Sequence, residues 1–159
     1  MTTLDSRPSV ETPIQLIDAR GPRFGAVLTT IVLAATLLTI PSFISLVLLG
    51  AQTIVFALGA IVGLRAQPYG SIYRRFVQPR LGRPTELEDP RPPRFAQSVG
   101  LLFAVVGLVA LLTGATTVAY VAVGAALAAA FLNAAFNFCL GCEMYLIGRR
   151  LFARSSTSA

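Results

Sequence analysis

Two long uncharged runs dominate the pattern of polar and apolar positions in this chain. The first covers residues 24–64 and the second covers residues 95–142, which makes them 41 and 48 residues long. A single membrane crossing needs only about 20 apolar residues. Each run therefore predicts two crossings that are joined as a helical hairpin.

Helix breakers near the middle of each run mark the turns of these hairpins. A straight helix as long as the first run would measure about 60 Å, roughly twice the thickness of the hydrocarbon core. Pro41 and Ser42 interrupt the first run, and Gly-Ala-Thr-Thr at 114–117 interrupts the second. Proline fits the first turn of a helix but not its interior. The pattern predicts four spans, at 24–40, 43–64, 95–113 and 117–140.

The residues before the two runs repeat. The motif Asp-x-Arg-x-Pro-Arg-Phe begins at Asp18 and again at Asp89, an offset of 71 residues. We therefore expect an all-α membrane protein whose four transmembrane helices form two tandem-duplicated hairpins. The expected segments are an N-terminal part (1–23), hairpin 1 (24–64), an Arg- and Pro-rich loop (65–94), hairpin 2 (95–142) and a C-terminal part (143–159).

The composition also indicates a membrane protein. Hydrophobic residues make up 55% of the chain and charged residues only 13%, which is too little charge to cover a water-soluble domain of this size. The N-terminal segment has three acidic residues and no short apolar core before a cleavage site. We therefore expect no cleaved signal peptide.

All 13 basic residues are arginines, and their distribution predicts the orientation of the chain. Three precede residue 24, seven lie between Arg65 and Arg94, and three follow Cys142, while the two expected hairpin turns carry none. Positively charged loops are retained in the cytosol. Both termini and the central loop should therefore face the cytosol.

The arginines also predict contact with lipid. The net charge of +6 lies on one predicted face of the membrane, so anionic headgroups are a closer partner than nucleic acid. Arg74 and Arg75, and again Arg149 and Arg150, lie beside apolar residues, as in amphipathic helices at the lipid interface. One short interfacial helix is expected after each hairpin. The alternative is that these arginines only set the topology.

Small and amide residues indicate how the helices pack, because close backbone approach drives helix association in lipid. The candidate helix-packing residues are Gly59, Gly63, Gln97, Gly100, Asn133 and Asn137. Such a pattern usually indicates helix contacts within one chain. The alternative is that these residues form contacts between the subunits of a homo-oligomer.

The missing residue types exclude several classes of protein. No ionisable Asp, Glu, Lys, Arg or His falls within a predicted span, whereas proton-driven transporters usually place such a group there. The chain has no His to act as a general base or metal ligand, and no Lys to complete a phosphate-binding loop. We therefore expect neither an ATPase nor a His-dependent hydrolase, and no bound cofactor.

The remaining chemistry is concentrated in the only two cysteines, Cys139 and Cys142, which form a Cys-x-x-Cys pair. The predicted orientation puts the pair at the cytosolic end of the fourth span, where thiols are kept reduced. Three interpretations stay open: a redox or sulfur-handling dithiol, inert small residues at a helix end, or a metal site. A metal would need two further ligands from elsewhere.

The chemistry of the pair depends on whether the fourth helix is continuous. On an unbroken helix, Asn133 and Asn137 lie largely on a different face from the thiols and would not assist them. Glu143 would lie on the side of Cys139 and oppose its ionisation. A break near Phe138 would instead place Cys139 at the N-terminus of a second helix, whose amide dipoles stabilise a thiolate.

Two stretches of the chain resemble a known family. They are residues 89–97 (Asp-Pro-Arg-Pro-Pro-Arg-Phe-Ala-Gln) and 133–145 (Asn-Ala-Ala-Phe-Asn-Phe-Cys-Leu-Gly-Cys-Glu-Met-Tyr). In combination they resemble the membrane family called domain of unknown function 4395, over roughly residues 16–153. The resemblance implies a four-helix protein of the bacterial cytoplasmic (inner) membrane with no established activity. Some members are encoded near thioredoxin-like or sulfurtransferase proteins, which implies a thiol or sulfur role for Cys139 and Cys142.

We therefore expect a small membrane protein that exchanges electrons or sulfur with a cytosolic thioredoxin-like or rhodanese-like partner, and that is not an autonomous enzyme. If the fourth helix breaks before the pair, Cys139 would be the attacking thiolate and Cys142 the resolving thiol. Two alternatives remain. One is a structural subunit of a larger membrane complex with incidental cysteines, and the other is a pore, assembled from two or more copies, for a small sulfur-containing or neutral solute.

Overall fold

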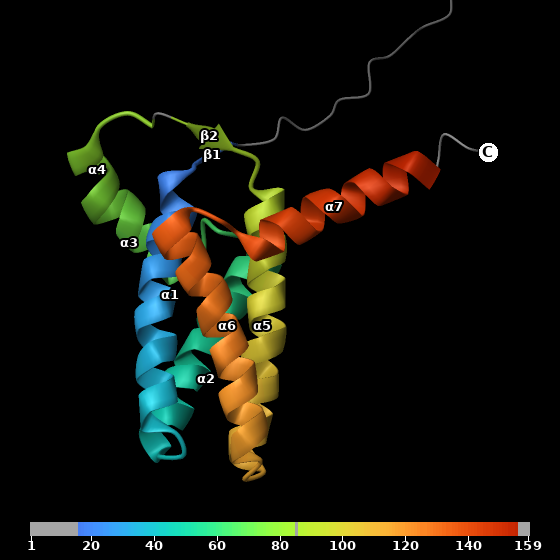
Figure 1. Ribbon diagram of the computed structural model, residues 1–159. Coiled ribbons are helices and arrows are strands. Elements are labelled where there is room, and N and C mark those ends of the chain that lie inside the picture. Colours follow the sequence, from blue (N-terminus) through green and yellow to red (C-terminus); the bar gives the residue numbers. More distant parts are fainter. Residues whose placement is uncertain (1–15, 85, 156–159) are drawn as a thin grey trace, which may run out of the picture.

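Four long helices form the body of the protein (Figure 1). The structure, a computed structural model, describes residues 16–84 and 86–155. The four helices are α1 (Arg20–Thr39), α2 (Phe43–Ala57) with its π-helical continuation η1 (Leu58–Val62), α5 (Arg91–Leu112) and α6 (Thr116–Phe136). They are 20 to 22 residues long with mean hydropathies of 1.5 to 2.3, which is long and apolar enough to cross a membrane.

The four apolar spans predicted from the sequence are confirmed. The first and third begin four residues earlier than predicted, because the Arg-x-Pro-Arg part of the repeated motif forms the first helical turn and only its aspartate precedes the helix. The fourth ends at Phe136, four residues before its predicted end. This early end shapes the candidate functional site.

The outer surface of the bundle is apolar. Among its large side chains, Leu38 is 87% exposed, Phe43 is 77% exposed and Val121 is 67% exposed. Proteins that fold in water rarely expose extended apolar surface of this kind. The surface and the four candidate spans together indicate a multi-pass membrane protein.

Much of the packed core lies in the half of the bundle nearer the hairpin turns, and it extends to Phe56 and Ala126. Both α1 and α5 pack against α2 and against α6. The buried apolar residues of the core are Leu33, Leu49, Phe56, Ala104, Val123 and Ala126. A Cβ added to Gly107 would lie 3.1 Å from Val123 and 3.2 Å from Leu49. Small residues therefore allow close helix contact in this half, as expected for packing in lipid.

A further helical segment follows each pair of long helices. The segments α3 (Pro68–Ile72), η2 (Tyr73–Val77) and α4 (Gln78–Leu81) succeed one another after the first pair, and α7 (Leu140–Ser155) follows the second. They lie at the end of the bundle opposite the hairpin turns (Figure 1). At the same end, β1 (Ile17–Asp18) pairs antiparallel with β2 (Leu87–Glu88). Two-residue strands are too short to leave a pattern in the sequence, and the prediction missed them.

The repeated motif has the same local structure in both halves. The backbone N–H of Arg20 donates to Asp18 Oδ1 at 3.1 Å, and that of Arg91 donates to Asp89 Oδ1 at 2.9 Å. A carboxylate that accepts from the first N–H groups of a helix stabilises its N-terminus. Each aspartate therefore starts one of the two long helices α1 and α5.

The phenyl ring that ends each motif packs against a tyrosine of the following short helix. Phe24 and Tyr73 have ring centroids 5.7 Å apart at an interplanar angle of 44°, and Phe95 and Tyr145 have centroids 5.8 Å apart at 47°. Tilted aromatic pairs at this separation are favourable. The contact between α1 and η2 is thus matched by the contact between α5 and α7.

The second arginine of each motif binds the C-terminal end of another long helix. Arg23 Nε donates to the carbonyl oxygen of Ala134 in α6 at 3.2 Å. Arg94 Nε donates to that of Ala60 in η1 at 2.7 Å, and its Nη2 donates to that of Ile61. The last carbonyls of a helix lack partners within the helix and carry partial negative charge, so each guanidinium stabilises a helix end.

The Asp18 carboxylate joins β1, α1 and η2 and gives a first testable prediction. It accepts hydrogen bonds from Arg20 Nε at 3.1 Å and from the Tyr73 hydroxyl at 2.8 Å, and its side chain is only 7% exposed. We expect Asp18→Asn to lower the free energy of unfolding by about 1 to 2 kcal/mol, because the charged acceptor is lost. Asp89→Asn is the matched control with a small effect. Thermal unfolding in detergent measures both.

The pH dependence of this effect has a defined sign. Burial raises the pKa of Asp18, but the hydrogen bonds from Arg20 and Tyr73 outweigh it, so the pKa lies below its usual value. A lowered carboxyl pKa gives stability above the pKa of the unfolded chain, about 3.9, and that stability is lost as the pH falls further. The difference between wild type and Asp18→Asn should therefore shrink below about pH 4. A difference that stays constant at low pH would contradict this assignment.

Candidate functional site

The fourth long helix ends just before the cysteines. Asn137 has a positive φ of 55° in the left-handed region, and its N–H donates to the carbonyl oxygen of Asn133 at 3.1 Å. Asparagine adopts this conformation more readily than most residues that have a Cβ. Residues 137–139 then cross from α6 to α7, which begins at Leu140. Of the two forms weighed from the sequence, the structure has the broken helix.

This break places Cys139 at the N-terminus of α7. The backbone N–H of Glu143 donates to the carbonyl oxygen of Cys139 at 3.0 Å, which closes the first turn. The sulfur of Cys139 accepts hydrogen bonds from the backbone N–H groups of Gly141 and Cys142 and from the thiol of Cys142. Both cysteines are free and partly buried. Amide groups at a helix N-terminus stabilise a thiolate there.

The two thiols therefore have opposite acidities. The hydrogen bond from the Cys142 thiol, with those from the two backbone amides, lowers the pKa of Cys139 to about 7 against the opposing effect of burial. The hydrogen bond to Cys139 and burial raise the pKa of Cys142, and the negative charges of Glu88 and Glu143 raise it further. Cys139 is thus the thiol that ionises more readily, while Cys142 keeps its proton.

Glu88 is a site residue that the sequence analysis missed. It lies on β2, far from the cysteines in the chain, and its charge opposes ionisation of both thiols. The pairing of β2 with β1 holds it near α7. Glu143 acts on Cys142 in the structure, whereas the unbroken helix considered from the sequence had placed it on the side of Cys139.

Gly141, between the cysteines, allows α7 to dock on α5. A Cβ added at this position would lie 2.6 Å from both the Cα and the Cβ of Ala96. No side chain larger than hydrogen fits without a shift of one helix. The ring contact of Phe95 with Tyr145 lies one helical turn further along α7. The close approach at Gly141 therefore fixes the first turn of α7, and with it the amides that face Cys139.

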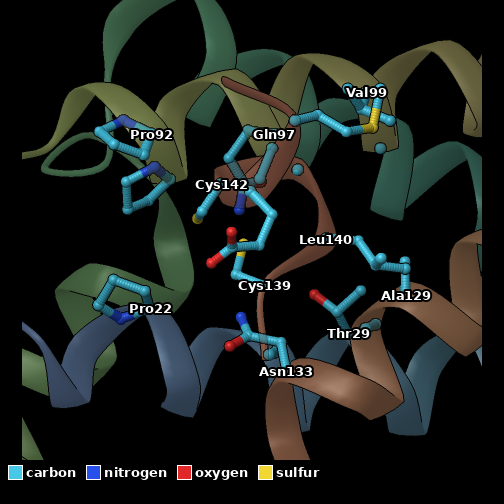
Figure 2. A pocket seen from close by; sticks show the side chains of 18 of the residues that line it. Pro22, Thr29, Pro92, Gln97, Val99, Ala129, Asn133, Cys139, Leu140 and Cys142 are labelled. Atoms are coloured by element: carbon cyan, nitrogen blue, oxygen red, sulfur yellow. The ribbon is translucent and has the colours of Figure 1, made fainter. Parts of the chain in front are cut away.

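A cavity of about 620 Å³ adjoins the two cysteines (Figure 2). Its walls come from α1, α5, α6, α7 and the residues 137–139, with Phe56 from α2. Apolar lining residues include Ala26, Phe56, Gly100, Phe103, Ala125, Ala126, Ala129 and Ala130, and polar ones include Arg23, Thr29, Glu88, Asp89, Gln97, Asn133, Asn137, Cys139, Cys142 and Glu143. Both cysteines thus line a cavity between the long helices and α7.

The helix break brings amides and thiols together in this cavity. Asn133, Asn137 and Gln97 line it along with both cysteines, and Figure 2 shows the Asn133 side chain directed toward Cys139. On the unbroken helix, the two asparagines would have lain on a different face from the thiols. The reversal of the chain at Asn137 removes that separation.

Of the remaining candidate packing residues, three lie in contacts between helices and one does not. A Cβ on Gly59 would lie 2.9 Å from Gln97, and one on Gly100 would lie 2.7 Å from Phe56, so both glycines allow close contacts between helices. Gln97 also accepts a hydrogen bond from Gln67 Nε2 at 3.0 Å. Gly63 has a φ of 120° and no atom within 4 Å of an added Cβ. Its backbone conformation at the end of η1, and not packing, accounts for the glycine.

The four arginines expected at the lipid interface are exposed and lie on the helices that follow each pair of spans. Arg74 and Arg75 are on η2, and Arg149 and Arg150 are on α7. One of the four has a local contact, since Arg74 Nη2 donates to the carbonyl oxygen of Arg65 at 2.6 Å. The helical segments that carry them follow the two pairs of spans, and α7 projects from the end of the bundle opposite the hairpin turns (Figure 1).

A comparison with protein families gives one match. The family described as "Domain of unknown function (DUF4395)" matches residues 17–150. The chain therefore belongs to this family, as the two stretches quoted from its sequence had indicated. No curated protein and no solved structure is similar to it. Within the described ranges, 16–84 and 86–155, no three His, Cys, Asp or Glu side chains are grouped as a metal site.

Proposed function

We propose that this member of a family of unknown function is a membrane thiol–disulfide exchange protein that acts through Cys139 and Cys142. The observation that carries the proposal is the break between α6 and α7, which aims two backbone N–H groups and a neighbouring thiol at the sulfur of Cys139. Low-pKa cysteines at helix N-termini are typical of disulfide oxidoreductases. The partner is a thioredoxin-like or rhodanese-like protein.

The exchange passes through a mixed disulfide. The Cys139 thiolate attacks one sulfur of a partner disulfide, so that a Cys139–partner bond forms and the partner S–S bond breaks. Cys142 then gives up its proton and attacks Cys139, which forms the Cys139–Cys142 disulfide and releases the partner as a dithiol. Two electrons leave the pair and two reach the partner. The same steps run in reverse when the partner is the electron donor.

A variant without the resolving thiol tests this function. In Cys142→Ser, the hydroxyl can still donate to Cys139, but nothing can displace the partner, so the mixed disulfide should accumulate at least tenfold over wild type. Gels run without reductant, followed by mass spectrometry of the captured species, measure it. Cys139→Ser and the double serine variant are the controls. Equal recovery of mixed disulfide from all variants, or none from any, contradicts the proposal.

We also propose that the two halves of the chain are tandem duplicates related by an approximate two-fold axis. The paired aspartate caps, the paired phenyl–tyrosine contacts and the paired arginine contacts support this. The strand register supports it as well, because Ile17 pairs with Glu88, its own counterpart at an offset of 71 residues. An axis that passes between β1 and β2 would relate each of these contacts to its partner.

The proposed setting is the bacterial cytoplasmic membrane, with both termini and the thiols in the cytosol and with α7 at the lipid interface. On α7, Leu140, Met144, Ile147 and Leu151 recur at helical spacing and are exposed. Such an apolar stripe, with Arg149 and Arg150 outside it, is suited to the headgroup boundary of an anionic membrane. Arg7, one of the arginines that support the orientation, lies outside the described residues.

Sided labelling tests this orientation. In intact cells, a membrane-impermeant maleimide should leave Cys139 and Cys142 unlabelled, and after lysis without detergent it should label Cys139. The reason is that positively charged segments stay on the cytosolic side. A cysteine introduced at Gly114 in the hairpin turn, on a background without the two native cysteines, should be labelled from outside. The opposite labelling pattern would show that the proposed orientation is wrong.

A further inference from the structure

The cavity beside the thiols lies among the four candidate membrane-spanning helices. The long helices α5 and α6 diverge toward the end of the bundle that carries α7 (Figure 1), and both line the cavity. Its lining on α6 runs from Asn133 to Ala125, and on α1 from Arg23 to Thr29. At 1.5 Å per residue these stretches cover about 10 Å, roughly a third of the hydrocarbon thickness. A molecule in this cavity would therefore be surrounded by the membrane-spanning part of the protein.

The walls suit a flat apolar ring. Ala125, Ala126, Ala129 and Ala130 line one side, and these short side chains leave space along α6. Phe56 and Phe103 add aromatic surface from α2 and α5, which favours offset or edge contacts with another ring. A volume of about 620 Å³ lies within the usual range of roughly 300 to 1,000 Å³ for small-molecule pockets.

The polar groups are gathered at the thiol end of the cavity. The Asn133 side chain points toward Cys139 (Figure 2) and has no hydrogen-bond partner among the described residues. Its amide N–H can donate to a carbonyl oxygen of a ligand. Three carboxylates, Glu88, Asp89 and Glu143, line this end against one guanidinium, Arg23. The net negative charge disfavours an anionic ligand and favours a neutral one.

We infer that this cavity binds a lipid-soluble quinone, which accepts two electrons from the reduced Cys139–Cys142 pair. The inference rests on the proposed thiol-redox function. A quinone is neutral, flat and apolar, its carbonyls accept hydrogen bonds, and it reaches the protein through the bilayer. A quinone carbonyl accepts from Asn133, the ring lies along the alanines of α6, and the isoprenoid tail leaves toward the lipid.

The electron transfer balances within the site. The Cys139 sulfur adds to the quinone ring, and Cys142 then gives up its proton and attacks Cys139. The Cys139–Cys142 bond forms as the bond between sulfur and ring breaks. The ring keeps two electrons and takes up two protons, one from each original thiol, to become the hydroquinone. A partner dithiol then reduces the Cys139–Cys142 disulfide, so electrons flow from partner to pair to quinone.

The direct test uses full-length protein in lipid nanodiscs with both cysteines reduced. Addition of a short-chain ubiquinone should yield one hydroquinone for every two thiols lost. A neutral soluble disulfide, bis(2-hydroxyethyl) disulfide, is added in a second arm. If the soluble disulfide oxidises the pair and the quinone does not, the quinone site is wrong and the thiol-exchange function stands. If neither oxidises the pair, both are wrong.

Substitutions at two neighbouring alanines test where in the protein the quinone binds. Ala129 lines the cavity and Ala128 does not. Ala129→Leu should lower the rate of quinone reduction at least tenfold, because the added side chain fills the cavity, while Ala128→Leu should leave the rate unchanged. Equal rates in the two variants would overturn the assignment.

A binding measurement on the wild type does not depend on how a variant folds. The hydroquinone cannot oxidise thiols, but in the cavity it should slow alkylation of Cys139 at least fivefold. Protection that saturates with hydroquinone supports the site. The absence of protection, or the same protection by a saturated phospholipid, would overturn it.

Discussion

Alanine in place of Gly141 is expected to separate α7 from α5 and to make the Cys139 thiol less acidic. The added Cβ would lie 2.6 Å from the backbone Cα of Ala96, a contact that no rotamer change can relieve. Overpacking of this kind costs typically about 1 to 3 kcal/mol. Because α7 also carries the N–H groups of Gly141 and Cys142 that face Cys139, a shift of this helix should raise the pKa of Cys139.

Gly148, on the same helix, gives the matched control for this variant. An added Cβ there meets nothing within 4 Å, and alanine is a better helix former than glycine by roughly 0.5 to 1 kcal/mol. Thermal unfolding in nanodiscs should therefore show a loss for Gly141→Ala and no loss for Gly148→Ala. The pH profile of Cys139 alkylation should move upward only in the first. Identical behaviour of the two variants would mean that the close approach to α5 is unimportant.

In the wild-type protein at pH 7, an alkylating reagent should modify Cys139 at least about five times faster than Cys142. The pKa of Cys139 is about 7, and that of Cys142 is raised above the ordinary value of 9. About half of the first thiol and at most about 1% of the second are then ionised, although the more acidic thiolate is the weaker nucleophile by roughly tenfold for two pKa units. The ratio follows from both effects.

Brief exposure to iodoacetamide followed by peptide mass spectrometry measures this ratio. The rate at Cys139 should rise through neutral pH and level off above about pH 8, since a group with a pKa near 7 is then fully ionised. The measurement follows the first alkylation of wild-type protein. A cysteine variant is not used, because replacement of either cysteine removes the hydrogen bond between the two thiols. A rate that keeps rising tenfold per pH unit up to pH 9 would show that α7 does not activate Cys139.

Long-range apolar patterns made the four spans predictable from the sequence. A bilayer requires each crossing to be an uncharged helix of about 20 residues. The long uncharged runs and the breakers at Pro41 and Gly114 therefore marked four crossings, and the repeated Asp-x-Arg motif marked where each pair begins. The spans were confirmed. Both α1 and α5 begin within the repeated motif, because its aspartate accepts a hydrogen bond from the first backbone N–H of the helix and its arginines lie in the first helical turn.

The site was only partly predictable, because its decisive feature is one residue in the left-handed conformation. The cysteine pair was visible in the sequence, and a helix break before it was one of two open forms. Nothing in the sequence alone showed that Asn137 takes a φ of 55°. The cavity could not be foreseen either, because it depends on the divergence of α5 and α6 and on Glu88, which a two-residue strand brings close to the thiols.

The most direct test of the account is a redox titration of the Cys139–Cys142 pair in wild-type protein. Protein in lipid nanodiscs is equilibrated in glutathione buffers of graded potential, quenched with acid and alkylated, and its mass is determined. We predict a single two-electron transition to an intramolecular Cys139–Cys142 disulfide, with a midpoint between roughly −120 and −270 mV, the range of known oxidoreductases. Two thiols that stay reduced across the whole range, or that form only separate adducts with glutathione, would contradict the account.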